Sequence, residues 1–287
     1  MRGVSSTARS GYSAKSYRTE AIVLRHHKLG EADRIVVLLT PDHGQIRAVA
    51  KGVRRTSSKL GATLEPFMHV DLQLIHGKNL DTITQAQLLH QYGAPIAASY
   101  QSYTAAAAMV ETAERLTSTD VDTTGPQFRL LHGALAMVAR GEGVAATIMN
   151  SYLLRALSTA GWAPSFTDCA RCTTPGPHEA LNIQLGGSVC ASCRPAGSRS
   201  PAPGTIRLLA ALLTGNWATV AQASAGEVRE ADSIVGEYVQ WHLERALKSL
   251  RLVERTPASE PPLDPPPGRR FSAARDQPHA AAPGAAP

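Results

Sequence analysis

Residues 34–53 read RIVVLLTPDHGQIRAVAKGV, and this stretch decides the fold class. RIVVLLT is almost continuously apolar and rich in β-branched residues, PDHG has the composition of a turn, and QIRAVAKGV resumes a loose alternation. Two such runs joined by a short turn sequence predict an antiparallel hairpin. The N-terminal part of the chain is therefore expected to be a β-structure.

Similar runs lie on both sides of this hairpin. EAIVLRHH at 20–27 precedes it across the turn LGEAD, and MHVDLQLIHG at 68–77 and DTITQAQLLHQ at 81–91 follow it. Five short strands with tight turns and no crossover helix predict a small antiparallel barrel. An OB-fold is the expected form, and an SH3-like barrel is the alternative that the sequence leaves open.

The hydrophobic period becomes helical after Gly93. A single helix is expected to begin near Pro95 and to run to Leu116, and further helices are expected at 126–140, 144–161, 205–215, 216–224 and 227–250. The first helix is expected to bury one broad face, made of Ile96, Tyr100, Tyr103, Ala107, Val110 and Leu116. The fold class is therefore predicted to be α+β, with an OB-fold barrel followed by a mainly helical domain.

The length and composition of the chain suggest two compact units with tails. The chain has 287 residues and a formal net charge of +6. We expect a disordered extension at 1–16, an OB-fold DNA-binding domain at 17–93, a helical domain at 95–252 with a zinc module at about 166–195, and a disordered Pro/Ala-rich tail at 255–287. No apolar run approaches the ~18 residues of a membrane span, and the first residues lack the apolar core of a secretory signal. A cytoplasmic location without a membrane partner is expected.

All the cysteines of the chain lie in one segment. They form two CxxC pairs separated by 17 residues, namely Cys169, Cys172, Cys190 and Cys193. This spacing is typical of a tetrahedral zinc site. Four thiolates leave no open position for a water molecule, so the single zinc ion is predicted to be structural, and His178 in the intervening loop is surplus.

Basic residues concentrate just after the central hairpin. The cations are Arg47, Lys51, Arg54, Arg55 and Lys59, and no acidic residue follows until Glu65. Such a loop on a barrel predicts an electrostatic track for nucleic acid, whereas a solvated loop is the plainer interpretation. The rings available for base stacking are Tyr17, Phe67 and Tyr92, and all three are compatible with a core position. Further arginines lie on the predicted helices, and the sequence does not show whether they converge: Arg115, Arg129, Arg140 and Arg155.

The chain carries no catalytic motif that we recognise. It contains no G-x-S-x-G, no phosphate-binding P-loop, no G-x-G-x-x-G after a strand and no H-E-x-x-H. A non-enzymatic binding protein is therefore predicted. Two alternatives stay open: a zinc-containing enzyme with a site assembled from scattered helices, and a protein–protein adaptor whose basic loop contacts an acidic protein tail.

The stretch from Tyr17 to Phe67 resembles the start of the bacterial recombination mediator family RecO, through its LGEADRI turn and its AKGVRR and LEPF segments. The resemblance implies an OB-fold, a helical domain with a zinc module, and no catalytic turnover. It also implies binding to single- and double-stranded DNA, annealing of complementary strands, and help in loading RecA onto strands coated by single-stranded DNA-binding protein. The implied partners are RecR and the acidic, apolar C-terminal tail of the coating protein, in the nucleoid of a bacterial cytoplasm. The family's basic barrel surface corresponds here to Arg34, Arg47, Lys51, Arg54, Arg55 and Lys59.

Overall fold

The computed structural model describes residues 16–56, 58, 60–118, 123–243, 250 and 253. Structural statements refer to these residues. The predicted disordered tail at 255–287, almost all of the predicted extension at 1–16, and Lys59 of the predicted DNA-binding set lie outside them.

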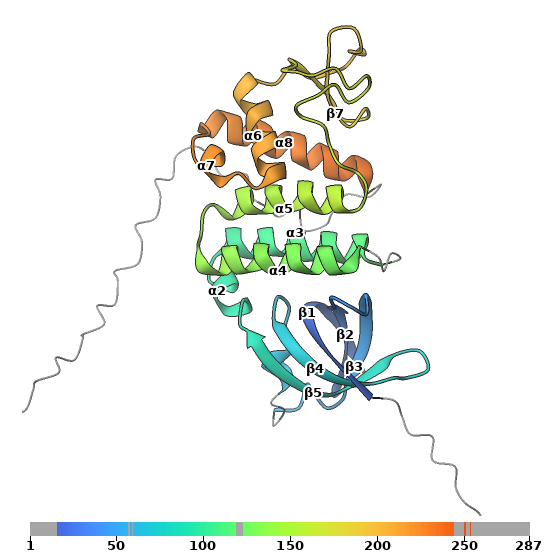
Figure 1. The fold of residues 1–287 in the computed structure, drawn as a ribbon. Helices are drawn as coiled ribbons and strands as arrows, with labels where there is room; N and C mark the ends of the chain where they lie inside the picture. The colour runs from blue at the N-terminus through green and yellow to red at the C-terminus, as the bar shows by residue number, and fades with distance from the viewer. Residues whose placement is uncertain are drawn as a thin grey trace, which may run out of the picture. The chain divides into compact units, whose positions relative to one another are not determined.

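The N-terminal part is a closed five-stranded barrel (Figure 1). Its strands are β1 (Ser16–Leu29), β2 (Asp33–Leu39), β3 (Gln45–Ala50), β4 (His69–Ile75) and β5 (Asp81–His90). They close in the order β1-β2-β3-β5-β4, with β3 and β5 parallel and all other neighbours antiparallel. A short helix, α1 (Leu60–Thr63), lies between β3 and β4. This ring of strands confirms the predicted OB-like fold.

The continuous apolar runs of β1 and β2 are explained by burial on both faces of the strands. In β1, Ala21 and Val23 belong to the interior of the barrel, whereas Ile22 and Leu24 belong to the core formed with the helices. Strand β2 divides in the same way, with Val36 and Leu38 inside and Val37 and Leu39 against the helices. Successive side chains of a strand point to opposite faces, so a strand covered on both sides needs apolar residues throughout.

The helix predicted from Pro95 to Leu116 is in fact two helices, so this prediction was wrong. The chain forms α2 (Gly93–Ala97) and then α3 (Tyr100–Leu116), with Ser99 between them in an extended conformation. The Ser99 hydroxyl accepts a hydrogen bond from the backbone N–H of Ser102 at 3.3 Å. A serine that caps a new helix in this way competes with continuation of the preceding one.

The predicted buried face of this segment was also partly wrong. Tyr100 and Tyr103 remain 52% and 48% exposed. The face that is buried consists mainly of small residues and one methionine, with Ala105, Ala108 and Met109 at its centre. Small side chains let α3 pack closely on its neighbour α5, whereas the Tyr103 ring contacts the Phe67 ring at 5.6 Å between centroids.

The rest of the chain is mainly helical, as predicted (Figure 1). It contains α4 (Thr124–Arg140), α5 (Ala145–Thr159), α6 (Pro203–Thr214), α7 (Trp217–Val220) and α8 (Ala225–His242). Helix α4 ends at Gly141, whose φ of 68° is left-handed, as is usual for a glycine that terminates a helix. The cysteine segment lies between α5 and α6 and includes the small hairpin of β6 (Ala180–Asn182) and β7 (Gly187–Val189). None of the described helices is both long and apolar enough to cross a membrane.

Helix α8 begins with a capping box. The Ser224 hydroxyl accepts from the backbone N–H of Glu227, and the Glu227 carboxylate accepts from the backbone N–H of Ser224 at 2.7 Å. We expect Ser224→Ala to lower the free energy of unfolding by about 1 kcal/mol, because the backbone N–H of Glu227 loses the hydroxyl that accepts its hydrogen bond. Urea denaturation followed by circular dichroism measures the change. Ser224→Asp, which keeps a capping oxygen, should stay close to the wild type, and equal loss in both variants would contradict the capping role.

Candidate functional site

The basic loop that follows β3 is held against the turn between β1 and β2. The backbone N–H of Gly52 donates to Asp33 Oδ1 at 2.7 Å, and the backbone N–H of Arg54 donates to the carbonyl of Ala32 at 2.9 Å. The Arg54 guanidinium also donates to the carbonyl of Gly30 at 3.0 Å. The first half of the loop is therefore placed by main-chain contacts, and its side chains project from a defined scaffold.

The predicted cations of β3 and of the loop after it lie at the surface. Arg47, Lys51, Arg54 and Arg55 are all exposed. Among the residues that the structure describes, no carboxylate forms an ion pair with any of these four. Their positive charge therefore remains available to an anion, and the fifth predicted cation, Lys59, lies outside the described residues.

Arg34 differs from the rest of the predicted set. Its guanidinium donates to Glu65 at 2.8 Å, and His26 Nε2 lies 3.0 Å from the same carboxylate. Burial opposes ionisation of Glu65, but the hydrogen bonds from Arg34 and His26 prevail and lower its pKa. The positive charge of Arg34 is thus already matched inside the protein.

Lys28 was missed by the sequence reasoning. It is exposed and lies directly opposite Arg34 in the register of β1 and β2, while Arg34 lies opposite Ala50, the residue before Lys51. Only the strand register reveals that Lys28, Arg34 and Ala50 lie in one row across β1, β2 and β3, at the same end of the barrel. In the sequence, the only signal for Lys28 was its position beside the LGEAD turn.

The three rings considered as stacking platforms do not offer free faces. Phe67 and Tyr92 are 4% and 8% exposed. Tyr17 is half-buried, donates its hydroxyl hydrogen bond to Asp81 and stacks on His76 with ring centroids 4.3 Å apart. These rings therefore serve the barrel, and the described structure supports phosphate contacts on this surface more directly than base stacking.

The four cysteines come together in space. One sulfur from each of Cys169, Cys172, Cys190 and Cys193 lies within 4.8 Å of every other. The Cys172 and Cys190 sulfurs are 3.8 Å apart, which equals the edge of about 3.8 Å expected for a tetrahedron with Zn–S bonds of ~2.3 Å. The set therefore has the size and chemistry of a metal site with no free position.

The surroundings of the four sulfurs shift their pKa values in opposite directions. Backbone N–H groups, first among them that of Cys190, lower the pKa of Cys169 to about 6. Contact with the neighbouring thiols, first Cys190 and then Cys172, raises the pKa of Cys193 to about 12. The cluster can therefore carry four thiolates only if a cation offsets their mutual repulsion.

The local fold of the module depends on its glycines and on contacts with α8. A Cβ atom at Gly187 would lie 2.0 Å from the carbonyl oxygen of Ser165, so no other residue fits there. The module is anchored by the Tyr238 hydroxyl, which donates to the carbonyl of Trp162 at 3.1 Å, and by the ion pair of Arg199 with Glu237. His178, as predicted, is not one of the clustered ligands, and its ring lies 2.9 Å from the carbonyl of Thr174.

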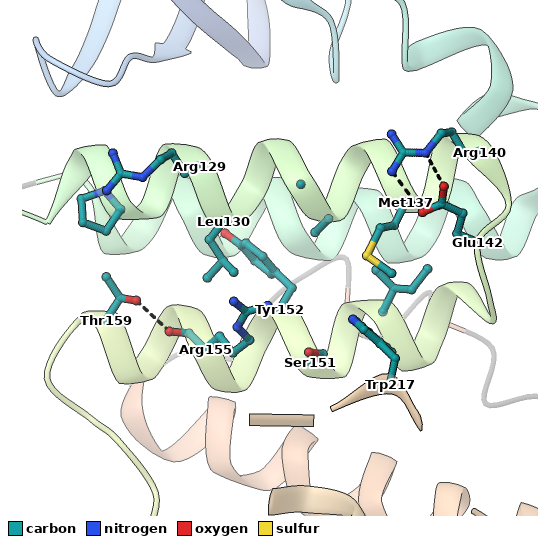
Figure 2. Close-up of a pocket in the computed structure, with 14 residues that line it drawn as sticks. Arg129, Leu130, Met137, Arg140, Glu142, Ser151, Tyr152, Arg155, Thr159 and Trp217 are labelled. Carbon is teal, nitrogen blue, oxygen red and sulfur yellow. Dashed lines mark hydrogen bonds and ion pairs between the residues drawn. The ribbon is translucent and has the colours of Figure 1, made fainter. Parts of the chain in front are cut away.

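A groove of about 690 Å³ lies between α4, α5 and α7, and sequence reasoning did not find it (Figure 2). Leu130, Met137, Ile148 and Trp217 form its apolar lining. Tyr152 reaches from α5 toward Leu130 and is almost fully buried, and its hydroxyl has no hydrogen-bond partner in the described part of the chain. A buried hydroxyl without a partner is costly, so Tyr152 lowers the stability of the packing between α4 and α5.

Three arginines border this groove. Arg129 and Arg140 lie near the two ends of α4, and Arg155 lies between them on α5 (Figure 2). Arg140 pairs with Glu142 at 2.6 Å, whereas Arg129 and Arg155 form no ion pair with any described carboxylate. The sequence left open whether the four helical arginines converge, and the structure places three of them on the border of one groove. Arg115 instead pairs with Glu111 on α3.

Comparison with known proteins agrees with this architecture. The family model described as "Recombination protein O N terminal" matches residues 15–92, and the model described as "Recombination protein O C terminal" matches residues 97–251. A protein named "DNA repair protein RecO" from Nocardioides sp. is 54% identical over 242 residues, which cover 83% of this chain and 99% of the relative. The predicted resemblance is confirmed, as is the expectation of a non-enzymatic role in DNA repair and recombination. The chain therefore belongs to the RecO family of DNA repair proteins.

Proposed function

We propose that this protein is a recombination mediator that binds single- and double-stranded DNA, anneals complementary single strands, and helps load RecA onto strands coated by single-stranded DNA-binding protein. The observation that carries this proposal is the set of cations on β3 and on the loop after it. Arg47, Lys51, Arg54 and Arg55 are exposed and form no ion pair with a described carboxylate. We add Lys28 and Lys59 to this set of proposed DNA contacts. Arg34 also belongs to the proposed surface, where its guanidinium is held by a hydrogen bond to Glu65.

Annealing follows from this arrangement without bond chemistry. Two complementary strands repel each other through their phosphates, and cations on a common surface reduce that repulsion while raising the local concentration of both strands. Since the rings of Tyr17, Phe67 and Tyr92 are engaged in contacts within the protein, the bases in this proposal stay free to pair. The protein in this proposal changes the rate of pairing and not the chemistry of DNA.

The DNA contact can be tested through its salt dependence. Neutralising Lys51, Arg54, Arg55 and Lys59 together should lower the log–log slope of affinity against salt by about 3 for a single strand, since each lost phosphate contact removes roughly 0.7. Fluorescence anisotropy of a labelled oligonucleotide across a salt series measures the slope.

The matched control removes the same charge elsewhere. Arg171, Arg194, Arg207 and Arg229 are exposed outside the barrel, and their replacement by glutamine should leave the slope nearly unchanged. An unchanged slope in the loop variant would move the DNA site away from the barrel. Absence of DNA binding by the wild type would favour the adaptor alternative, in which the basic loop contacts an acidic protein tail.

We further propose that the four cysteines hold one structural Zn²⁺. The short distances between the four sulfurs, and the need of four thiolates for a compensating cation, support zinc as the ion. Four thiolate ligands leave no position for a reacting water molecule. The ion would stabilise a segment whose own apolar cluster is very small, consisting of Cys169, Ala180 and Val189 with a few partly buried neighbours. A zinc-containing enzyme is disfavoured by this saturated ligand set.

Cys172→Ser tests the zinc assignment. The variant should lose the zinc that the wild type retains after gel filtration in metal-free buffer, and its cysteine module should unfold at lower temperature, because metal binding and folding are coupled in such modules. Elemental analysis and thermal unfolding provide the two readouts. His178→Ala should retain the ion, and a Cys172→Ser variant with full zinc and unchanged melting would rule out the site.

For the protein partners, we propose that the groove between α4 and α5 receives the acidic, apolar C-terminal tail of single-stranded DNA-binding protein. The two ends of α4 that carry Arg129 and Arg140 are about 16 Å apart, which is the reach of about five extended residues. Arg129 and Arg155 on the rim, which form no ion pair with a described carboxylate, suit acidic residues, and the apolar lining suits a large apolar side chain. RecR is proposed as a further partner on the strength of the family alone.

The double variant Arg129→Ala with Arg155→Ala tests the groove. Its affinity for a synthetic acidic C-terminal-tail peptide should fall by about tenfold or more, since charged hydrogen bonds contribute about 1.5–3 kcal/mol each. Isothermal titration calorimetry measures the affinity, and Arg207→Ala on the exposed side of α6 is the control. Equal affinity for the double variant and the wild type would place the tail elsewhere.

The domain division that we propose is 17–93 for the DNA-binding barrel and 95–252 for the helical domain with its zinc module at about 166–195. The separate interior cluster of the barrel and the limits of the two family models support it. The chain itself starts β1 one residue earlier, at Ser16, which pairs with Ile75. A nucleoid location in the bacterial cytoplasm is part of the same proposal.

A further inference from the structure

Three histidines from three different elements meet where the barrel contacts α4. His69 begins β4, His90 ends β5 and is its cross-strand partner, and His132 lies on α4. One ring nitrogen from each lies within 4.8 Å of those of the other two. The cluster is separate from the cysteine module, from the basic loop and from the lining of the groove.

The hydrogen bonds of the cluster define the state of its buried member. His69 is 4% exposed, and its Nε2 lies 2.9 Å from Glu20 Oε2. A carboxylate accepts hydrogen bonds, so Nε2 carries the proton of the neutral ring and Nδ1 carries the free lone pair. That Nδ1 lies 2.9 Å from Nδ1 of His90 and therefore points into the cluster.

We infer that His69, His90 and His132 form a second metal site, which takes a divalent ion that prefers imidazole ligands, with Zn²⁺ as the first choice. Imidazole nitrogens are common ligands of Zn²⁺. In such sites a carboxylate often accepts a hydrogen bond from the other ring nitrogen of a histidine ligand and so orients the ring, and Glu20 supplies that carboxylate for His69. Three protein ligands leave the fourth position to water or to an oxygen of a bound molecule. His90 is exposed, so an ion can enter from solvent.

The geometry is close to that of a bound ion. Zn–N bonds of ~2.05 Å in a tetrahedron place two ligand nitrogens about 3.3 Å apart. The 2.9 Å separation between His69 and His90 is therefore less than about half an ångström from the bound distance, which small rotations of the rings can provide. Burial lowers the pKa of His69 and of His132, which agrees with neutral rings that have lone pairs to donate.

Aromatic contacts hold the third ring in place. His132 stacks on Phe128 of the same helix with ring centroids 6.2 Å apart, and its Nε2 lies 3.0 Å from the Tyr92 hydroxyl. His69 also contacts the Phe128 ring, at 5.7 Å between centroids. An ion at this position would link two strands of the barrel to α4, so it would stabilise the contact between the two parts of the protein.

The test is a titration of Zn²⁺ into the full chain after gel filtration, followed by isothermal titration calorimetry and by thermal unfolding. The wild type should bind one additional zinc per chain with micromolar or tighter affinity and should melt at higher temperature when the ion is present. His90→Ala should lose both effects. Glu20→Gln should weaken the affinity by about 10- to 100-fold, as is usual when the group behind a histidine ligand is removed.

The control is His27→Ala, which removes an exposed histidine of β1 and should bind the additional zinc like the wild type. Because His90 is exposed, its replacement should preserve the fold, and an unchanged circular dichroism spectrum with the tight zinc retained verifies this. Absence of an additional binding event in the wild type would overturn the inference. Equal binding by His90→Ala and the wild type would overturn it as well, since the ion would then occupy another position.

Discussion

Burial of β1 and β2 on both faces is the constraint on which the rest of the structure depends. Ala21 and Val23 fill the barrel, while Ile22 and Leu24 of the same strand belong to the core of the helices. One short apolar run thus takes part in two cores, and the barrel cannot shift along the helices without exposing one of them. The ion pair of Arg25 with Glu114 and the bond from Gln45 to the Glu114 carbonyl add polar contacts at this junction.

The arginines of the barrel separate into two groups with different surroundings. Arg18, Arg25 and Arg34 each pair with a carboxylate of the protein, whereas the loop after β3 carries cations without such partners in the described structure. A paired arginine contributes little field to its surroundings, because the neighbouring carboxylate cancels it at distances beyond a few ångströms. The potential that we propose to attract nucleic acid therefore comes from the cations of β3 and of the loop after it, although arginines are distributed over the whole barrel.

The two clusters of potential metal ligands illustrate how donor type sets the role of a site. The four sulfurs would saturate a tetrahedral ion, which would give the cysteine module a core that its few apolar residues do not supply. The three imidazoles would leave one position open, and they lie between two parts of the fold. Their spacing in the sequence is irregular, because the ligands come from β4, β5 and α4 and converge only through the barrel closure and its packing on α4.

Local chemistry in the sequence was sufficient to determine the five strands, most of the helices and the four clustered cysteines. Alternation in strands, the helical period and the CxxC spacing all act over short distances, so they can be read before the chain is folded. The same reasoning failed at Ser99, whose hydroxyl caps a new helix. It also failed at Tyr100 and Tyr103, which stay about half exposed because smaller residues form the buried face of α3. Tertiary structure alone decided that Arg34 is matched by Glu65, that Lys28 joins the row of Arg34, and that three histidines meet. Each of these contacts joins separate elements, and their geometry is set by strand register and helix packing, which no local pattern of residues specifies.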